Sequence, residues 1–496
     1  MSRFTQTWLP AALALICAVA LGASPALAAT SGAHARTPTT HRVGGRVHKA
    51  WPRSGDKPPR SALARWLARQ VGPTKVRPCT TRVDARAVKC HRRRAPRNGT
   101  PLPGAQPGDS APQPSSGASR TMSDDMNPIA YAAGGSSSAP TGSAGTTNLQ
   151  LVRSYAIPTD DPFYTRLLNW SWTYDSAVTA AAFTVFGATS EAQQLLDQLA
   201  ALQHPDGSIE LAFNVTDGTT EAIFRSGTIA TVGLAGSLYD QHTHTNRYLG
   251  MEERAASYLI SLQGTDGLVR GGPDVGWYST QHNLLAYAFL NQLGNELVAD
   301  GERSTANTYF NPANKISSGL ESRLLVQNGS QAWFIEGLAD SVQSLDADAL
   351  GVLYLASKHE TTNAQKVLAY TNSAFAVSGR SIARSAGADT YNNTYAALGP
   401  FSGFKPFLGA GAPDVMWTEG SAEMVLADLA TGQSSTALST SLLAIAALTP
   451  ASGPLMADRA ATNMAYSAEF HVWPSAAAGA WLMLATAHPT LFPSQS

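Results

Sequence analysis

The chain has 496 residues, 44% of them hydrophobic and only 14% charged, and its 35 Lys and Arg residues balance its 35 Asp and Glu residues. The charge is unevenly divided, because residues 31–120 carry a net +16 and residues 121–496 carry a net −17. A nucleic-acid partner is excluded because the large acidic part would repel phosphate. A multispanning membrane protein is excluded because no later apolar run reaches the ~20 residues that cross a bilayer.

Residues 1–28 are typical of a signal peptide for Sec-type export. Arg3 gives a positive start, residues 9–22 are apolar, and Ala26 and Ala28 form the A-x-A pattern that signal peptidase accepts. No Arg-Arg pair is present in this segment, which argues against twin-arginine export. An uncleaved membrane anchor is the alternative. We therefore expect a protein that is secreted or associated with the cell envelope.

Residues 29–147 form a basic, low-complexity arm that we expect to be mostly disordered. The arm is rich in Arg, Pro, Gly and Ser, so it has little apolar surface to bury. Residues 61–71 predict one short amphipathic helix around Trp66. Cys79 and Cys90 are the two cysteines of the mature chain, and in an oxidising compartment they would form one disulfide. The arm would contact an anionic cell envelope by charge alone, or act as a solubilising spacer.

Residues 148–496 predict one large all-α domain. Alanine- and leucine-rich helical patterns recur between loops that contain Gly, Pro and Asn, and alternating β patterns are scarce. The predicted helices span residues 174–186, 190–203, 226–240, 251–262, 280–297, 316–327, 345–357, 363–375, 419–429, 435–448 and 475–487. Such a series of paired helices favours a closed ring of helical hairpins, an (α/α)6 toroid, over a simple bundle.

A short internal repeat supports this architecture. The pattern L-Q-x-x-D-G occurs at residues 202–207 and again at 262–267, each time at the end of a predicted helix. It is typical of a helix end in which Gly adopts a positive φ. Helical hairpins that recur at this period indicate a repeat architecture.

Aromatic residues precede several of the predicted helices. Seven of the ten tryptophans lie in this domain, and Trp172, Trp277, Trp417 and Trp473 each stand just before a helix. Inner helices of a ring run parallel, so their first residues would meet at one rim and offer flat faces to sugar rings. The alternative is that these tryptophans cover the core of the ring. Trp333 is a further candidate for substrate binding.

Three carboxylates share this position and are the candidate catalytic residues. Asp175, Asp346 and Glu419 each lie in the first turn of a predicted helix, where the helix dipole commonly places an acid. The helices that follow are apolar and small, so burial would raise the pKa of these acids toward the range of a general acid. Two such groups across a funnel suit glycoside hydrolysis. Glu419 is the expected acid, since Glu has the longer reach.

Several polar residues near these positions are candidates for substrate binding. Tyr174 adjoins Asp175, Asp274 precedes Trp277 in the same loop, His282 follows Trp277, and His471 precedes Trp473. Glu423 lies one turn after Glu419 and is either a supporting group or a solvated one. No Gly-rich phosphate loop and no Cys/His metal cluster is found in the sequence, so neither a cofactor nor a metal ion is predicted.

These motifs resemble the six-hairpin, (α/α)6-toroid glycosidase superfamily over residues 148–490. The resemblance rests on T-Y-D-S-A at 173–177, the two L-Q-x-x-D-G helix ends, W-T-E-G at 417–420 and F-H-V-W-P-S at 470–475. Family-8 endoglucanases and their relatives carry Ser-Glu-Gly at the catalytic acid, where this chain has Thr-Glu-Gly. The resemblance implies Glu419 as proton donor, with Asp175 or Asp346 as base, in an uncharacterised branch.

We therefore expect a monomeric, secreted glycoside hydrolase that acts on a neutral or cell-envelope polysaccharide or oligosaccharide. The net charge of −17 on residues 121–496 argues against polyuronate substrates. A polysaccharide lyase is the first alternative, with Tyr174, His282 or Tyr391 as its base. A non-catalytic glycan-binding protein of the envelope is the second. A terpene cyclase is disfavoured, because the Asp346–Asp348 segment lacks the further acid that its chemistry needs.

Overall fold

The structure is a computed structural model that describes residues 60–73, 148–159, 161, 163–338, 340, 342–382, 400–409, 411–448, 453–463 and 468–495. The chain divides into two compact units, Met1–Gly55 and Asp56–Ser496, and everything described below belongs to the second. The signal peptide, the Cys79–Cys90 pair and Tyr391 lie outside the described residues. Within these ranges, no helix combines the length and apolar character needed to span a bilayer.

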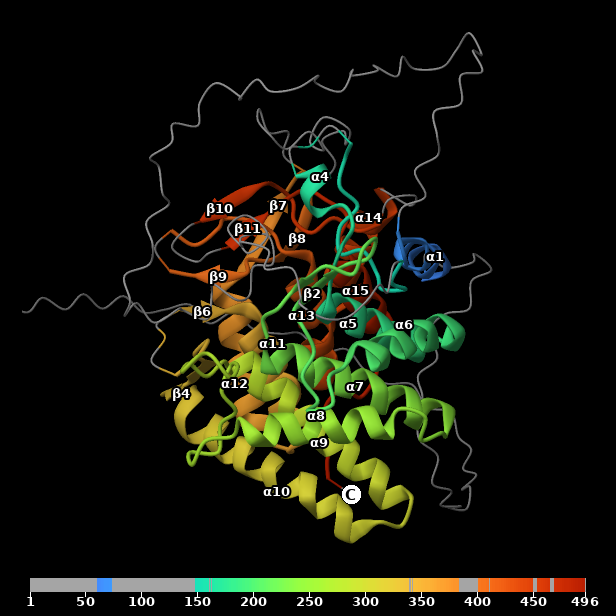
Figure 1. Cartoon of the computed structure of the whole chain (residues 1–496). Helices are drawn as coiled ribbons and strands as arrows, with labels where there is room; N and C mark the ends of the chain where they lie inside the picture. Colours follow the sequence, from blue (N-terminus) through green and yellow to red (C-terminus); the bar gives the residue numbers. More distant parts are fainter. Residues whose placement is uncertain are drawn as a thin grey trace, which may run out of the picture. The chain divides into compact units, whose positions relative to one another are not determined.

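Six helices form a closed inner ring. Each packs on the next along the chain, and the last returns to the first (Figure 1). The ring consists of α5 (Thr173–Val185), α7 (Ser226–Thr243), α9 (Thr280–Ala299), α11 (Leu345–Ser357), α13 (Thr418–Ala430) and α15 (Ala476–Ala487). These helices are buried on nearly all sides, as expected for helices that are apolar all round. Their many Ala and Gly residues let the helices approach closely.

Five outer helices each pack on the inner helix that precedes them in the chain. They are α6 (Thr189–Leu202), α8 (Leu249–Ser261), α10 (Arg303–Gly319), α12 (Thr361–Ala374) and α14 (Thr436–Leu448). In contrast to the inner helices, they are amphipathic. In α6, for example, only Ala192, Leu195, Leu196 and Leu199 are buried, which is one stripe at helical spacing.

The twelfth helix of the ring comes from far upstream in the sequence. Helix α1 (Arg60–Gln70) packs on α15 and so completes the sixth hairpin. Trp66 is only 1% exposed, and a Cβ at Gly453 would lie 2.2 Å from its indole. The predicted amphipathic helix is therefore present. Composition groups it with the basic arm, whereas its packing joins it to the toroid.

Ten of the eleven predicted helices are present, with ends within three residues of those expected. The helix predicted at 316–327 is wrong. There, α10 ends at Gly319, a π-helical turn η1 (Leu320–Leu324) follows, and a strand begins at Leu325. Pro312 inside α10 and the polar residues around it concealed the buried stripe that contains Tyr309 and Ile316.

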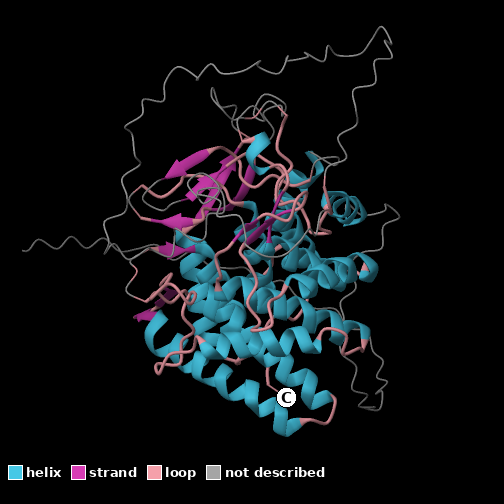
Figure 2. Cartoon of the chain, in the orientation of Figure 1, coloured by secondary structure: helices cyan, strands magenta, loops and turns pink. Residues whose placement is uncertain are grey.

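Short antiparallel strands lie in the loops between the helices. These strands were not predicted from the sequence. In Figure 2 most of them gather at one end of the helices. Two lead directly into inner helices, since β1 ends at Trp172 before α5 and β6 ends at Ser344 before α11. The strands are β1 (Trp170–Trp172), β2 (Ala212–Asn214), β3 (Thr220–Glu221), β4 (Leu325–Asn328), β5 (Gln331–Phe334), β6 (Gln343–Ser344), β7 (Ala376–Arg380), β8 (Phe401–Phe404), β9 (Phe407–Leu408), β10 (Ala461–Asn463) and β11 (Ala468–Phe470).

The two L-Q-x-x-D-G segments form equivalent joints between outer helices. Gly207 and Gly267 have φ values of 92° and 87°, in the region that Gly adopts without strain. Gln203 Nε2 donates to the Met251 carbonyl at 3.0 Å, and Gln263 Nε2 donates to the Pro312 carbonyl at 3.0 Å. Each motif thus ends one outer helix and binds the next, so the repeat indicated by the sequence is confirmed.

Candidate active site

The first turns of the inner helices meet at one rim of the ring. Tyr174, at the start of α5, donates its hydroxyl to Glu419 Oε1, at the start of α13, at 3.0 Å. Trp481, on the intervening helix α15, donates its indole N–H to the Tyr174 hydroxyl at 2.7 Å. This chain of hydrogen bonds links three inner helices that are remote in sequence. It also holds one oxygen of Glu419 and leaves Oε2 available for a proton.

Glu419 and Asp175 are two acids of this rim whose pKa values are strongly raised. Removal from water, together with the negative charges of Asp175 and Asp346, raises the pKa of Glu419 to about 8. Burial raises the pKa of Asp175 to about 7, although a hydrogen bond with Ser154 opposes the shift. Asp175 is only 6% exposed, and its Oδ2 atom has no hydrogen-bond partner. Glu419 is half-buried, which gives a substrate access to it.

Three further carboxylates lie beside this pair. Asp346, Glu336 and Glu423 are almost fully buried, and both side-chain oxygens of Glu336 and of Glu423 lack a partner. Burial raises the pKa of Glu423 well above its usual range, and the charges of Asp346 and Glu419 raise it further. Burial and the charge of Asp346 do the same for Glu336. These three acids lie close enough to one another and to Glu419 for their charges to interact.

Glu336 is the acid that the sequence analysis missed. It lies between β5 and β6, outside any helix, so its position has no periodic pattern. Its backbone carbonyl accepts the N–H of Thr280 at 2.8 Å, which fixes it to the first residue of α9. This contact and its neighbours, the Thr280 hydroxyl bond to the Ile335 carbonyl and the Ser279–Gly337 bridge, bring Glu336 to the rim. Glu423 was noted from its spacing to Glu419, and its full burial excludes the solvated alternative.

The four tryptophans do precede inner helices, but two of them offer no face to a ligand. Trp473 has no exposed surface, and Trp172 is 5% exposed. Both contact the ring of Tyr155, each with centroids 5.8 Å apart, in a small apolar core above the helices. Trp417 is half-buried and lies over Gly420, where a Cβ would be 2.4 Å from its indole. The Gly of the W-T-E-G motif therefore makes room for the indole of Trp417.

Trp277 belongs to a second group at the starts of α7 and α9. Arg225 pairs with Asp274 at 2.7 Å, and its guanidinium lies 5.9 Å from the Trp277 ring. His282 contacts the other side of this indole, with centroids 5.5 Å apart, and its Nδ1 atom lies 3.0 Å from the Ser226 hydroxyl. Burial and the charge of Arg225 lower the pKa of His282 to about 3, so its ring is neutral.

The two remaining candidates lie in other settings. Trp333, on β5, stacks on Tyr370 of the outer helix α12 with centroids 5.0 Å apart. His471 stacks on Trp473 at 3.7 Å and pairs with Glu469 at 3.0 Å. The structure thus brings Asp175, Glu419 and Asp346 together, whereas Trp333 contacts an outer helix instead of this group.

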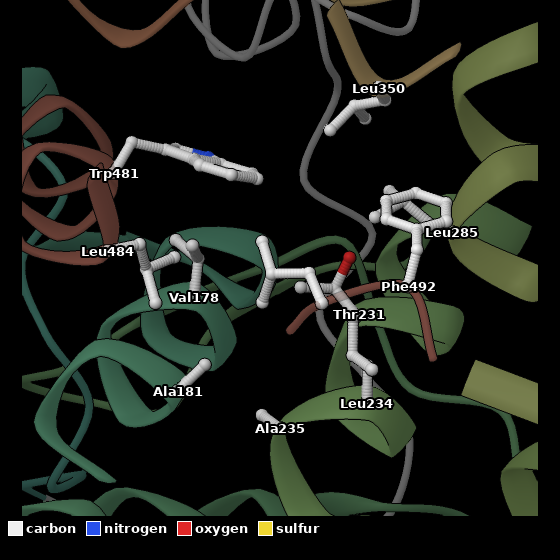
Figure 3. Close-up of a pocket in the computed structure, with 11 residues that line it drawn as sticks. Val178, Ala181, Thr231, Leu234, Ala235, Leu285, Leu350, Trp481, Leu484 and Phe492 are labelled. Carbon is white, nitrogen blue, oxygen red and sulfur yellow. The ribbon is translucent and has the colours of Figure 1, made fainter. Parts of the chain in front are cut away.

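Below the rim, the axis of the ring is closed by apolar side chains. A small cavity lies between Trp481, Val178, Leu285 and Leu350 (Figure 3). The space that the centre of a water molecule can occupy in it is about 20 Å³. Leu491 and Phe492, beyond the last helix, line the same cavity and are almost fully buried. That volume holds a single water at most. Because no sugar fits there, a substrate would approach Glu419 from the rim side.

Comparison with solved structures identifies the fold. A glycosidase variant superposes with a TM-score of 0.50 at 15% identity, over 71% of this chain and 93% of the other. The chain has the toroidal fold of that glycosidase. The all-α, (α/α)6-toroid fold predicted from the sequence is thereby confirmed.

Two other structures are similar at a lower level. A bacterial glucoamylase in complex with acarbose gives a TM-score of 0.48 at 14% identity, and the match covers 65% of this chain but only 50% of that enzyme. A family-76 glycoside hydrolase, a mannosidase from Bacteroides thetaiotaomicron, gives 0.46 at 10% identity, over 70% and 93% of the two chains. No protein family profile matches the sequence. No curated protein matches it either.

Proposed function

We propose that the chain is a glycoside hydrolase in which Glu419 is the general acid. The observation that carries this proposal is the setting of Glu419: half-buried at the rim, hydrogen-bonded by Tyr174, with a pKa raised to about 8. A carboxylic acid with such a pKa is protonated at neutral pH and can donate to a glycosidic oxygen. The solved structure that matches with a TM-score of 0.50 is named a glycosidase, which supports the same reaction class.

Tyr174 has a defined part in this step. Its hydroxyl donates to Glu419 Oε1, so it stabilises the carboxylate that forms when Oε2 gives up its proton. The indole N–H of Trp481 donates to the Tyr174 oxygen and fixes the direction of that hydroxyl. The hydrogen bond gains strength as charge develops on Glu419, which is the property of a group that favours the transition state.

We assign Asp175 as the second carboxylate of the reaction, acting on water or on the sugar. Its charge raises the pKa of Glu419, so an ionised Asp175 keeps the acid protonated. Asp346 is the alternative that the sequence left open. It is the less suited of the two, because it is only 1% exposed and its Oδ1 atom already accepts the Ala347 N–H at 2.9 Å.

The substrate that fits this rim is a neutral glycan of the cell envelope or its surroundings. The net charge of −17 on residues 121–496 disfavours a polyuronate. A lyase would also need a base, and the two candidates within the described residues do not serve. Burial raises the pKa of Tyr174 well above its usual range, and burial lowers that of His282 to about 3. We further propose that the enzyme is exported and works as a monomer, with its basic arm in contact with anionic envelope polymers.

The test is release of reducing ends from a panel of neutral polysaccharides and oligosaccharides. We expect release by the wild type and a loss of at least about 1,000-fold in kcat for Glu419→Gln. Glu191→Gln is the matched control, because Glu191 also lies in the first turn of a helix but on the outer face, on α6. Equal release by the wild type and Glu419→Gln would reject Glu419 as the acid. Binding without release by the wild type would favour a glycan-binding protein.

A further inference from the structure

A second cluster of acids lies away from the rim, between three helices. Asp240 is near the end of α7, Glu296 is near the end of α9, and Glu252 is in the first turn of α8. One oxygen from each of the three side chains lies within 4.8 Å of the others. Since Glu419 is at the start of an inner helix, this cluster belongs to the opposite end of the ring.

The carboxylates of this cluster are buried and incompletely paired. Glu252 has no exposed surface and Glu296 is 6% exposed. Both oxygens of Glu296 and the Oε1 atom of Glu252 have no hydrogen-bond partner. A buried ionised carboxylate without a partner is costly, so this arrangement needs either a proton or a cation. One of the unpartnered oxygens of Glu296 lies within the cluster, which is where a ligand would bind.

Among the surrounding groups, the Arg247 guanidinium supplies only part of the missing positive charge, because it lowers the pKa of Asp240 against the larger effect of burial. Asp240 accepts the Tyr248 N–H at 2.5 Å and the Thr245 hydroxyl at 2.7 Å, and Glu252 accepts the Ser237 hydroxyl at 2.8 Å. All three donors are neutral. The nearby Arg247 pairs with Asp197 through Nη2 at 2.9 Å. Within the described part of the chain, no ion pair involves any of the three acids.

The helix ends make the need for a cation greater. The C-terminal end of a helix carries partial negative charge, which disfavours a carboxylate and favours a cation. Asp240 and Glu296 both lie near such ends, on α7 and α9. Two acids in an electrostatically unfavourable place, next to a third, form a site in which a bound cation would offset all of these costs.

We propose that Asp240, Glu252 and Glu296 bind one calcium ion that joins α7, α8 and α9. Calcium takes carboxylate oxygens at about 2.3–2.6 Å in flexible geometry, so two ligands on opposite sides of the ion are about 4.8 Å apart. The cluster spans no more than that distance. This site could not be predicted from the sequence, because the three acids are separated by 12 and 44 residues and share no metal-binding motif.

The experiment uses the full-length chain after treatment with a chelator and dialysis. Titration calorimetry with calcium chloride at pH 7.5 should give one site per chain. Calcium at about 100 times the measured Kd should raise the Tm of the wild type by about 3 °C. Glu296→Gln and Glu252→Gln should bind no calcium and show no such rise. Glu253→Gln, adjacent on α8, is the matched control and should respond as the wild type does.

The competing explanation is that Glu252 and Glu296 share a proton. Burial raises the pKa of Glu296 to about 8 and that of Glu252 well above its usual range, so a proton would also relieve the charge. In that case calcium would leave the Tm unchanged, and the proposal would be overturned. The same conclusion would follow if Glu296→Gln and the wild type gained equally from calcium. Because Gln is nearly isosteric with Glu and carries no charge, the variants should fold, and circular dichroism will verify this. The result is independent of hydrolytic activity.

Discussion

Replacing Glu419 by Gln should abolish hydrolysis and stabilise the protein at alkaline pH. The pKa of Glu419 is raised from 4.5 to about 8 by burial and by Asp175 and Asp346, so the folded chain binds this proton more tightly than the unfolded chain does. Between these two pH values the native state therefore holds more protons than the unfolded state, and the free energy of unfolding falls as pH rises. Replacement by glutamine removes the titrating group, so the variant does not lose this part of its free energy of unfolding as the pH rises.

The size of the effect follows from the shift. At 1.36 kcal/mol per pKa unit, a shift from 4.5 to about 8 corresponds to at most about 5 kcal/mol above pH 8. Glu419 is partly exposed, so water solvates part of the charge, and about 2 kcal/mol is the gain that we expect. Below pH 4.5 the acid is mostly protonated in both the folded and the unfolded state of the wild type. There the variant should gain nothing and should lose a little with the altered hydrogen bond to Tyr174.

The assay is urea denaturation of the wild type and Glu419→Gln at pH 5 and at pH 8.5, with equal m-values required. Glu191→Gln serves as the control for a generic loss of negative charge, because Glu191 is on the outer helix α6. The difference between Glu419→Gln and the wild type should grow by about 2 kcal/mol between the two pH values. A difference that is the same at both would refute the pKa assignment, and with it the role of Glu419 as an acid at neutral pH.

Three further substitutions test other parts of the structure. Trp66→Ala should lower the free energy of unfolding by about 3–5 kcal/mol in urea denaturation, since the indole is 1% exposed and joins α1 to the ring. An unchanged denaturation midpoint would mean that α1 does not close the toroid. Gly207→Ala should cost more than about 2 kcal/mol in the same assay, because φ is 92° and the new Cβ would lie 2.0 Å from the Arg254 carbonyl oxygen. Tyr174→Phe removes the hydrogen bond that lowers the pKa of Glu419, so the alkaline limb of the kcat/KM profile against pH should move to higher pH. The value of kcat should fall about 10- to 100-fold. An alkaline limb that moves to lower pH would contradict the hydrogen bond.

The helices were predictable because their signals are local. The apolar run at 345–357 gives a helix with those same ends, and the alanine-rich segment after Asp175 gives α5. The closed ring was predictable from the number of such helices and from the repeated helix ends at Gly207 and Gly267. The place of α1 was not, because its three arginines at 60, 65 and 69 match the composition of the arm, and only its contact with α15 shows where it belongs.

The candidate site was predictable in part. Asp175 and Glu419 could be found because each follows a tryptophan at the start of an apolar helix, and the two do meet at one rim. The exposure of the tryptophans, and so their ability to bind a substrate, could not be predicted in the same way. Trp473 and Trp417 both stand shortly before an inner helix, yet the first has no exposed surface and the second is half-buried. Burial at a helix start depends on the loops above it, which the sequence pattern does not specify.

Two opposing effects act on the acids of the rim, and their magnitudes decide the chemistry. A helix N-terminus favours the ionised form of a carboxylate by about 0.3–1 kcal/mol, and by about 2 kcal/mol at most. The pKa of Glu419 is nevertheless raised to about 8, which at 1.36 kcal/mol per unit reflects an opposing effect of up to about 5 kcal/mol from burial and like charges. Burial prevails only because six helices bring Glu419, Asp175 and Asp346 to one opening. The raised pKa of Glu419 therefore depends on the closed ring. A variant that opens the ring should bring this pKa back toward 4.5.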